Sequence, residues 1–269
     1  MFKNLLKVAL QKLGYRQAVY LGNNLILTKV FHYKMVLPAT DLSMTPGLIL
    51  DGYWEPMVTK LFLDLLRPGM TVLDIGAAFG YYTLLSADKV GEIGKVISFE
   101  PEPSNFEIIE KNIFLNGFQK RVMLINKAVA DKEGTALLHY KKDYVHGAPS
   151  LVGSFQEKTI EVETVTIDNF LHTNNIKNID IVKIDVEGYE PFVIKGMENT
   201  IQYTKRLIII LEFSPLIYRS IGISPESFLK TLLEQFAVVK KINLFNGKLE
   251  NINLKDLEKD DLFMCYCEK

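Results

Sequence analysis

The chain has 269 residues, of which 48% are hydrophobic, and its 31 basic and 32 acidic residues give a formal net charge of −1. This length suits one large α/β domain with extensions, and the apolar content is sufficient for a substantial core. With the charges nearly balanced, nothing in the composition points to nucleic acid or an acidic polymer as an electrostatic partner. We therefore expect no nucleic-acid partner.

Residues 1–13 combine lysines with leucines at helical spacing, which predicts an amphipathic helix. Two roles are open for this helix, contact with a membrane surface or packing on its own domain, and we favour the second. No signal peptide is evident, and no apolar run is long enough to cross a bilayer. We expect a cytoplasmic protein, and the sequence leaves its oligomeric state open.

The segment up to residue 50 predicts a hairpin, with strands at 18–21 and 25–31 around a turn at 22–24. We therefore divide the chain into an N-terminal extension of helix and hairpin, residues 1–50, and a main domain, residues 51–269.

From residue 53 onward, predicted helices and strands alternate. Helices are expected at 53–66, from about 81, and at 103–116, 191–200 and 225–236, and strands at 71–75, 95–100, 122–126, 179–185, 206–213, 238–244 and 262–267. This βαβ order predicts a doubly wound α/β fold with a mainly parallel sheet whose last strand is antiparallel. An inserted β-loop at 134–166, with β-segments at 135–140 and 158–167, interrupts the alternation.

Cys265 and Cys267 lie two residues apart in the last predicted strand and so share one face of it. Their Cα atoms would be roughly 6.5–7 Å apart, at or beyond the reach of a disulfide. No cluster of Cys or His supplies the remaining ligands of a zinc site. We expect buried, reduced thiols here and assign no metal site. A metal-assisted reaction stays open, because Asp185, Glu187 and Glu190 could supply oxygen ligands, although acidic residues at a helix start look the same in sequence.

The strand at 71–75 contains Asp74 and leads into a turn bracketed by Gly76 and Gly80. In open α/β sheets, this strand–turn–helix unit holds a nucleotide-like ligand at the carboxyl end of the strand. The phosphate-loop pattern GxxxxGK[ST] is absent, and the dinucleotide pattern needs a G-x-G that this turn lacks. The observed spacing, Asp-x-Gly-x-(Gly/Ala)-x-Gly, suits a cationic ligand without phosphate, such as S-adenosylmethionine.

Two further acidic residues, Glu100 and Asp185, also lie at the carboxyl ends of predicted strands. In this architecture these ends meet at the ligand crevice, so the three carboxylates predict one site. A carboxylate at Glu100 can accept hydrogen bonds from both hydroxyls of a ribose.

Four stretches together resemble the FkbM family of S-adenosylmethionine-dependent methyltransferases. They are 74–84 (DIGAAFGYYTL), 99–103 (FEPEP), 112–116 (NIFLN) and 183–190 (KIDVEGYE), and the resemblance extends over residues 50–215. Ala78 stands where family members more often carry Asn, a difference that should leave cofactor binding intact. The resemblance implies the seven-stranded class I methyltransferase fold, S-adenosylmethionine as cofactor, and methylation of a hydroxyl on a sugar, glycan or other small molecule. Two alternatives stay open: methyl transfer to an amine or protein side chain, and a catalytically silent module that only binds the cofactor.

The resemblance also implies roles for individual residues. The methionine part of the cofactor would lie against Asp74, Gly76, Ala77 and Gly80. The ribose would lie against Glu100 and Pro101, and the adenine against Lys127 and Ala128. Glu55 would close over the cofactor, and Asp185 would face the reacting methyl group. The aromatic side chains of Trp54, Tyr81 and Tyr82 can stack on the cofactor or a sugar, or can simply pack in the core.

The acceptor hydroxyl must lose a proton, and its candidate bases are Asp185, Glu187, Glu190 and His146. Glu187 and Glu190 can equally stabilise the start of the following helix, and a loop histidine such as His146 is more often only solvated. Lys183 shares the strand face of Asp185 and can either pair with a carboxylate or contact the acceptor in catalysis. An unpaired buried lysine would be costly, so Lys183 needs a partner if it is buried. We expect residues 40–56 and 141–158 to bind the acceptor.

Overall fold

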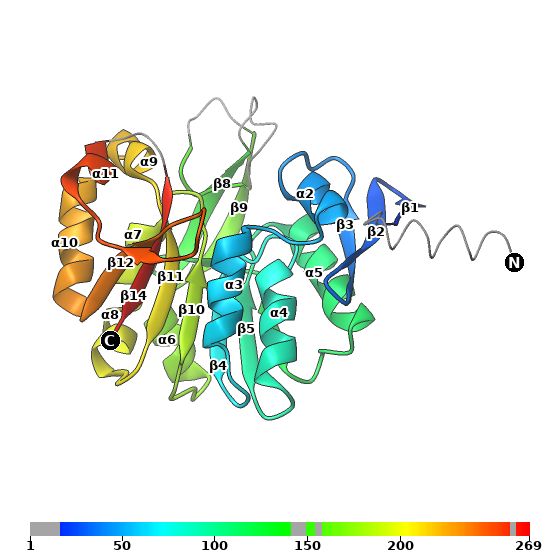
Figure 1. Ribbon diagram of the computed structural model, residues 1–269, viewed down its shortest axis with the longest axis horizontal. Coiled ribbons are helices and arrows are strands. Elements are labelled where there is room, and N and C mark those ends of the chain that lie inside the picture. The colour runs from blue at the N-terminus through cyan, green and yellow to red at the C-terminus, as the bar shows by residue number, and fades with distance from the viewer. Residues whose placement is uncertain (1–16, 141–148, 154–157, 259–261) are drawn as a thin grey trace, which may run out of the picture.

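The computed structural model of the chain describes residues 17–140, 149–153, 158–258 and 262–269. Its largest sheet contains β4 (Thr71–Ile75), β5 (Lys95–Phe99), β6 (Val122–Ile125), β10 (Ile181–Ile184), β11 (Ile208–Phe213), β12 (Val238–Ile242), β13 (Leu249–Glu250) and β14 (Phe263–Glu268). Across the sheet these strands follow the order β13-β12-β14-β11-β10-β4-β5-β6, and the six from β12 to β5 are labelled in Figure 1.

The predicted mainly parallel sheet with an antiparallel last strand is confirmed. Strands β11, β10, β4, β5 and β6 are parallel to their neighbours in this series, whereas β14 is antiparallel to both β11 and β12. The two-residue strand β13 adds an eighth strand at the edge, beyond the seven that were expected. The chain runs outward from β4 to β6 and then returns to β10 on the other side of β4. The order therefore reverses between β4 and β10, where open α/β sheets bind their ligands.

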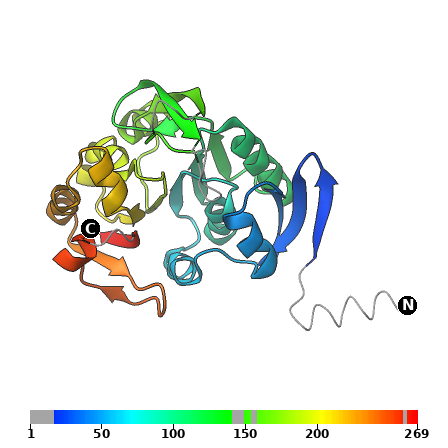
Figure 2. The ribbon, with the colours of Figure 1, turned by 90° about the horizontal axis from the view of Figure 1, so that it is seen from above.

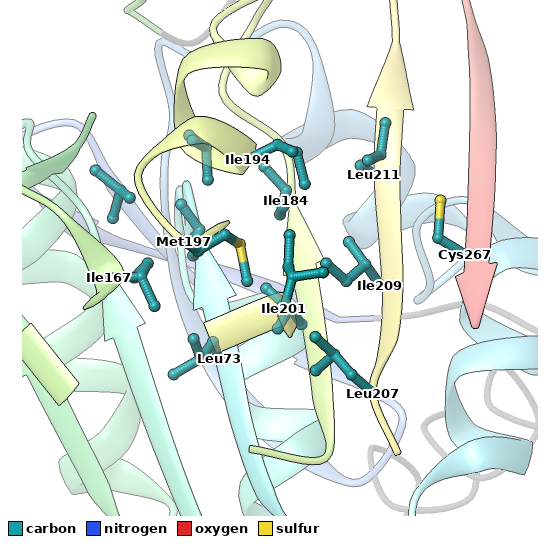
Figure 3. Packing of buried hydrophobic residues seen from close by; sticks show 14 of the residues in the cluster. Leu73, Ile167, Ile184, Ile194, Met197, Ile201, Leu207, Ile209, Leu211 and Cys267 are labelled. Atoms are coloured by element: carbon teal, nitrogen blue, oxygen red, sulfur yellow. The ribbon is translucent and has the colours of Figure 1, made fainter. Parts of the chain in front are cut away.

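Helices cover both faces of the sheet, because successive residues of each buried strand point to opposite sides. On one face, Val72 packs with α2 (Met44–Leu50), α3 (Pro56–Leu65), α4 (Tyr81–Val90) and α5 (Pro103–Leu115). On the other face, Leu73 belongs to a cluster with α6 (Ile167–Thr173), α7 (Glu190–Lys195), α8 (Glu198–Tyr203), α9 (Pro215–Ser220), α10 (Pro225–Gln235) and α11 (Leu254–Glu258). Figure 3 shows this second cluster, with Ile194, Met197 and Ile201 packed over the strands.

The N-terminal extension forms a separate antiparallel sheet of β1 (Ala18–Gly22), β2 (Leu25–Val30) and β3 (Tyr33–Pro38). The predicted hairpin is confirmed, and β3 adds a strand that was not expected. Asn112 of α5 fastens this sheet to the main domain, because its side chain exchanges hydrogen bonds of 2.6 and 2.9 Å with the backbone of Val36. The N-terminal strands and the C-terminal strands lie at opposite ends of the molecule (Figure 2). The predicted helix at 1–13 lies outside the described residues, and the boundary at residue 50 stays a prediction.

The insertion forms a third sheet, in which β8 (Gly134–Tyr140) pairs antiparallel with β9 (Lys158–Val165), and β9 pairs parallel with β7 (Ala128–Val129). The predicted strand at 158–167 is two residues too long. It ends at Val165 because Thr166 caps the next helix, where its hydroxyl accepts a hydrogen bond from the backbone of Asn169 at 3.2 Å.

The predicted helix at 191–200 is divided into α7 and α8 at Gly196. A Cβ atom at Gly196 would lie 2.0 Å from the carbonyl oxygen of Ala130, so the backbone approaches its neighbour too closely for any side chain. Cys265 and Cys267 are buried free thiols, as expected, with their Sγ atoms 3.7 Å apart. No described helix has the length and apolar character needed to span a membrane.

Candidate active site

Strands β4 and β10 bring two charged side chains together at the point where the strand order reverses. Asp74 and Lys183 are register partners on these adjacent parallel strands and therefore point to the same face of the sheet. Asp185 follows β10, and its Oδ2 atom lies 2.8 Å from Nζ of Lys183. The predicted need of Lys183 for a carboxylate partner is thus met.

Lys183 is almost completely buried, with 1% of its side chain exposed. Burial opposes its charged form, but the carboxylates of Asp185 and Glu55 outweigh burial and raise the pKa of Lys183 above its ordinary range. The ring of Tyr82, whose centroid lies 5.0 Å from Nζ, adds a favourable cation–π contact. The surroundings of Lys183 therefore favour its charged form next to Asp185.

A cavity of about 460 Å³ opens above these strand ends. Its walls come from the segment after β3, the segment before α3, the glycine turn after β4, the start of α4, and the ends of β10 and β11. The lining includes Asp41, Met44, Trp54, Glu55, Asp74, Gly76, Ala77, Ala78, Tyr81, Tyr82, Lys183, Asp185, Glu187 and Glu212. Four of these, Asp41, Met44, Trp54 and Glu55, belong to the 40–56 segment that was expected to bind the acceptor.

A second, narrower cavity of about 40 Å³ lies beside the first. Its lining contains Glu100, Pro101, Lys127 and Ala128, which were assigned from the sequence to the ribose and adenine, together with Ser150 and Leu151 of the inserted segment. Gly76, Ala78, Asp185 and Glu187 line both cavities. The two cavities therefore meet at Asp185.

The carboxylate of Glu100 lies at the floor of the narrower cavity and is buried. The backbone N–H groups of Ala78 and Glu102 donate hydrogen bonds to its two oxygens at 2.8 and 2.9 Å. Burial raises the pKa of Glu100 to about 8, although these two hydrogen bonds oppose the shift. Each oxygen keeps a second lone pair, so the carboxylate can still accept hydrogen bonds from a diol.

The glycine turn depends on a close backbone approach. Gly76 has φ +82°, and a Cβ atom there would lie 1.9 Å from the carbonyl oxygen of Asp185. Only glycine therefore allows the ends of β4 and β10 to lie so close together. Gly80 does not line either cavity and instead precedes α4 with φ 83°. Its role at the cofactor stays a prediction.

Three non-glycine residues of the cavity walls have left-handed backbones, namely Glu55 at φ 42°, Ala78 at φ 51° and Glu187 at φ 55°. Such conformations cost about 1–2 kcal/mol each and are concentrated at functional sites. Glu55 accepts a hydrogen bond of 2.8 Å from the hydroxyl of Tyr82, and burial raises the pKa of Glu55. The hydroxyl of Ser150 donates to the carbonyl of Glu187 at 2.9 Å.

Asp74 and Tyr81 line the wide cavity, and buried polar contacts hold both side chains in place. Thr83 donates a hydrogen bond of 2.6 Å to Asp74, whose pKa burial raises to about 6. The hydroxyl of Tyr81 lies 3.1 Å from that of Thr59. Lys127 lines the narrower cavity, but its ammonium group forms an ion pair with Glu163 at 2.7 Å.

The structure argues against Glu190 as a base. Its Oε1 atom accepts hydrogen bonds from the backbone N–H groups of Val186 and Gly188, and its Oε2 atom accepts one from the hydroxyl of Tyr218. Its side chain is fully buried and lines neither cavity. Glu190 therefore holds the 186–188 turn in place. His146 lies outside the described residues.

Glu212 is a cavity residue that sequence reasoning did not assign to the site. It lies in β11, one strand beyond β10, near the carboxyl end of that strand. Position near a strand end is the signal that identified Asp74, Glu100 and Asp185, and it could have identified Glu212 as well.

The strand order, the glycine turn after β4 and the acidic crevice between β4 and β10 define a class I methyltransferase. The model of the methyltransferase FkbM domain matches residues 74–236. The chain belongs to this family. It is a methyltransferase, and S-adenosylmethionine is its cofactor.

Individual relatives differ in the acceptors that their names state. Hexuronic acid methyltransferase AglP of Haloferax volcanii is 23% identical over 186 residues, which cover 69% of this chain and 71% of that protein. Ribosomal RNA large subunit methyltransferase E of Chromohalobacter salexigens is 51% identical over 53 residues, which cover 18% of this chain and 25% of that protein. A solved SAM-dependent methyltransferase from Aquifex aeolicus has a TM-score of 0.45 at 17% identity, covering 83% of this chain and 93% of that chain.

The residues of the crevice fit S-adenosylmethionine chemically. The cofactor carries positive charge, and the carboxylates of Asp74, Glu55 and Asp185 line the wide cavity beside the glycine turn. Gly76 leaves room for backbone contact, and Glu100 presents a carboxylate to the narrower cavity. These side chains therefore suit a cationic nucleoside with a free ribose diol.

Proposed function

We propose that this methyltransferase acts on a hydroxyl of a sugar, glycan or other small polar molecule, and that Asp185 receives the hydroxyl proton. The observation that carries this proposal is the position of Asp185. Its carboxylate is held by buried Lys183 and lies where the wide and narrow cavities meet. A group at this junction can contact the cofactor on one side and an acceptor on the other.

The cofactor roles follow the two cavities. Gly76 and Ala77, with Asp74 behind them, hold the methionine part, and Gly80 begins the helix that supports this turn. Glu100 and Pro101 hold the ribose, and Lys127 and Ala128 lie along the adenine. Glu55 and Tyr81 line the wide cavity, and we assign the rest of this cavity to the acceptor.

When bound, S-adenosylmethionine supplies an electrophilic methyl group. The protein must then align an acceptor oxygen, and alignment in model reactions is worth up to about 10⁵–10⁸ M in effective concentration. A base in hydrogen-bond reach adds about 10²–10⁴ in rate. Lys183 keeps the carboxylate of Asp185 in position for this step. Glu187, which lines both cavities, would orient a second hydroxyl of the acceptor.

Two features support a small polar acceptor over RNA or a protein. The described lining of the wide cavity carries several carboxylates, which repel a phosphate backbone. The relative AglP, with 71% of its length matched, is named for a hexuronic acid acceptor, whereas the ribosomal RNA methyltransferase matches only over 53 residues.

Incubation with S-adenosylmethionine labelled on its methyl group tests the proposal. The panel contains neutral, acidic and amino sugars, polyhydroxylated small molecules, peptides and RNA, and D185N is the matched control. We expect the label on an oxygen of a small hydroxylated compound and almost none with D185N. Label found only on nitrogen, peptide or RNA would contradict the proposed acceptor. Failure to bind S-adenosylhomocysteine would contradict cofactor binding itself.

A further inference from the structure

An apolar groove of about 740 Å³ shares no lining residue with the two cavities of the candidate active site. Its walls come from the N-terminal sheet, from α5 and from β6 at the edge of the large sheet. On α5, the side chains of Phe106, Glu110, Ile113 and Phe114 line the groove, and their spacing places them on one face of the helix. The groove therefore lies between this face of α5 and the strands beside it (Figure 1).

The N-terminal sheet presents an apolar face to the groove. Val19, Leu27 and Val36 are register partners across its three strands and so point to the same side, and Leu27 and Val36 line the groove. The opposite side of the sheet packs on the main domain through Met35 and Leu37, which are fully buried. The groove side is therefore the side of this sheet that is left uncovered.

Several large apolar side chains remain exposed in the groove. The side chain of Phe114 is 70% exposed and that of Leu21 is 51% exposed. Val122 and Leu124 of β6 line the same surface, where the large sheet ends. A contiguous apolar surface usually marks an interaction site, and proteins commonly cover the edge strand of a sheet. We therefore regard the groove as a docking surface.

The segment that immediately precedes this sheet has the pattern that such a groove accommodates. Residues 1–16 lie outside the described part of the chain, and their sequence contains one apolar stripe with spacings of three and four residues, as in an amphipathic helix. The stripe consists of Phe2, Leu5, Leu6, Ala9, Leu10 and Leu13. Gly14 follows it, and glycine is the residue type that most often ends a helix.

The dimensions of the segment also suit the groove. A helix of residues 1–13 would be about 20 Å long, the same length as α5, which has 13 residues. Residues 14–17 can span at most about 13 Å, so the end of such a helix must stay close to Ala18, where β1 begins. β1 is itself a wall of the groove, through Leu21. So short a tether gives the segment a high effective concentration at its own groove, which favours it over a second copy of the chain.

We propose that residues 1–13 form an amphipathic helix that docks in the groove between α5, β6 and the N-terminal sheet of the same chain. The exposed carboxylate of Glu110 at the rim complements the lysines that flank the apolar stripe, whereas neighbouring Lys111 forms an ion pair with Glu107 at 3.4 Å. The docked helix covers the exposed apolar side chains and the β6 edge of the large sheet. This role is independent of the methyl acceptor.

Two pairs of variants of the full chain test the docking. L6D/L10D places two charges in the apolar stripe, and N4D/Q11D places the same two charges on the polar side of the predicted helix.

The second pair changes the groove. F114S removes an aromatic side chain from its wall, and I93S removes an apolar side chain that is 82% exposed outside the groove. Binding of S-adenosylhomocysteine, measured by calorimetry, verifies that each variant is folded.

Amide hydrogen exchange and zero-length carbodiimide cross-linking are then measured. We expect L6D/L10D and F114S to speed exchange in β1 and β2 by at least about tenfold, because the apolar contacts of the docked helix are lost. N4D/Q11D and I93S should exchange like the wild type. In the wild type, lysines of residues 1–13 should form cross-links to Glu107 or Glu110, and L6D/L10D should lose them.

The same measurements identify the other possible occupants of the groove. Cross-linking of an equal mixture of ¹⁵N-labelled and unlabelled protein shows whether each link joins one chain or two. Links only between labelled and unlabelled peptides would place a second copy in the groove and overturn the proposal. Sedimentation of the wild type with phosphatidylglycerol–phosphatidylcholine vesicles, without links inside one chain, would assign the segment to a membrane surface and overturn it as well. Equal exchange in the wild type and all four variants would also refute the docking.

Discussion

Replacing Asp185 by Asn should lower both the stability of the protein and its activity, through two different contacts. Lys183 is 1% exposed and Asp185 28% exposed, and their charged atoms are 2.8 Å apart. Removal of one partner of a fully buried pair costs about 3–5 kcal/mol. Here Glu55 also favours the charged form of Lys183, and the ring of Tyr82 remains beneath it. We therefore expect D185N to lose about 1–3 kcal/mol of unfolding free energy.

Urea denaturation measures this loss, and D131N is a matched control. Asp131 pairs with Lys195 at 2.9 Å, but the side chain of Lys195 is 60% exposed, so breaking this pair should cost only about 0.2–1 kcal/mol. The double variant K183M/D185N should recover most of the stability, because it removes the buried charge together with its partner.

The catalytic part of the prediction concerns the same variant. D185N should reduce turnover by about 10²–10⁴, the usual contribution of a positioned base. Its affinity for S-adenosylhomocysteine, measured by calorimetry, should change little. Equal stability losses in D185N and D131N would refute the importance of the buried pair. Retained turnover would refute the role of Asp185 as base, and loss of cofactor affinity together with turnover would instead make Asp185 a cofactor ligand.

Three further predictions concern the turn after β4 and the buried carboxyl group of Glu190, which holds the 186–188 turn. G76A should abolish cofactor binding and destabilise the protein more than G117A, because both residues have positive φ but only the Cβ at Gly76 meets backbone, at 1.9 Å; calorimetry and melting curves compare the two, and equal effects would refute the close approach. A78G should raise the melting temperature by about 2–4 °C, since relief of a left-handed backbone outweighs the entropy cost of glycine; a lower melting temperature would contradict it. Burial raises the pKa of Glu190 to about 7, so its contribution to stability is complete below about pH 4.5 and is lost as pH rises through 7. E190Q should therefore lose less stability than the wild type between pH 5 and 8, and parallel pH profiles of urea denaturation would show that Glu190 does not titrate there.

The strands at the crevice were predictable because their signals are local. The runs at 71–75 and 95–100 are short, apolar and β-branched, and each is followed by a turn signal. Asp74, Glu100 and Asp185 each lie at the end of a predicted strand, and this position alone predicts that they share one edge of the sheet. All three line the cavities.

Short elements were harder to predict because tertiary contacts decide them. The helices α2, α6 and α9 have six or seven residues each, too few for a periodic pattern to appear. Gly196, where α7 ends, leaves no room for a side chain because the carbonyl of Ala130, 66 residues away in the chain, lies against it. No propensity of the local sequence contains that information.

Only the structure distinguishes the role of Glu190 from that of Glu187. Both acidic residues flank Gly188 at a helix start, and their sequence context is the same. The hydroxyl of Tyr218, 28 residues away, and two backbone N–H groups draw Glu190 into the core. Glu187 instead lines both cavities.

The sequence by itself determined the cofactor half of this protein, because the glycine turn and the acidic strand ends are contiguous motifs whose spacing carries their chemistry. Only the tertiary structure decided the wall that we propose for the acceptor. That wall is assembled from segments that are far apart in the chain. The hydroxyl of Tyr82 donates a hydrogen bond to Glu55, and the hydroxyl of Ser150 donates one to the carbonyl of Glu187. Glu212 of β11 lines the same cavity. Such a wall has no local pattern, since each contact depends on how the sheet, the insertion and the N-terminal extension pack together.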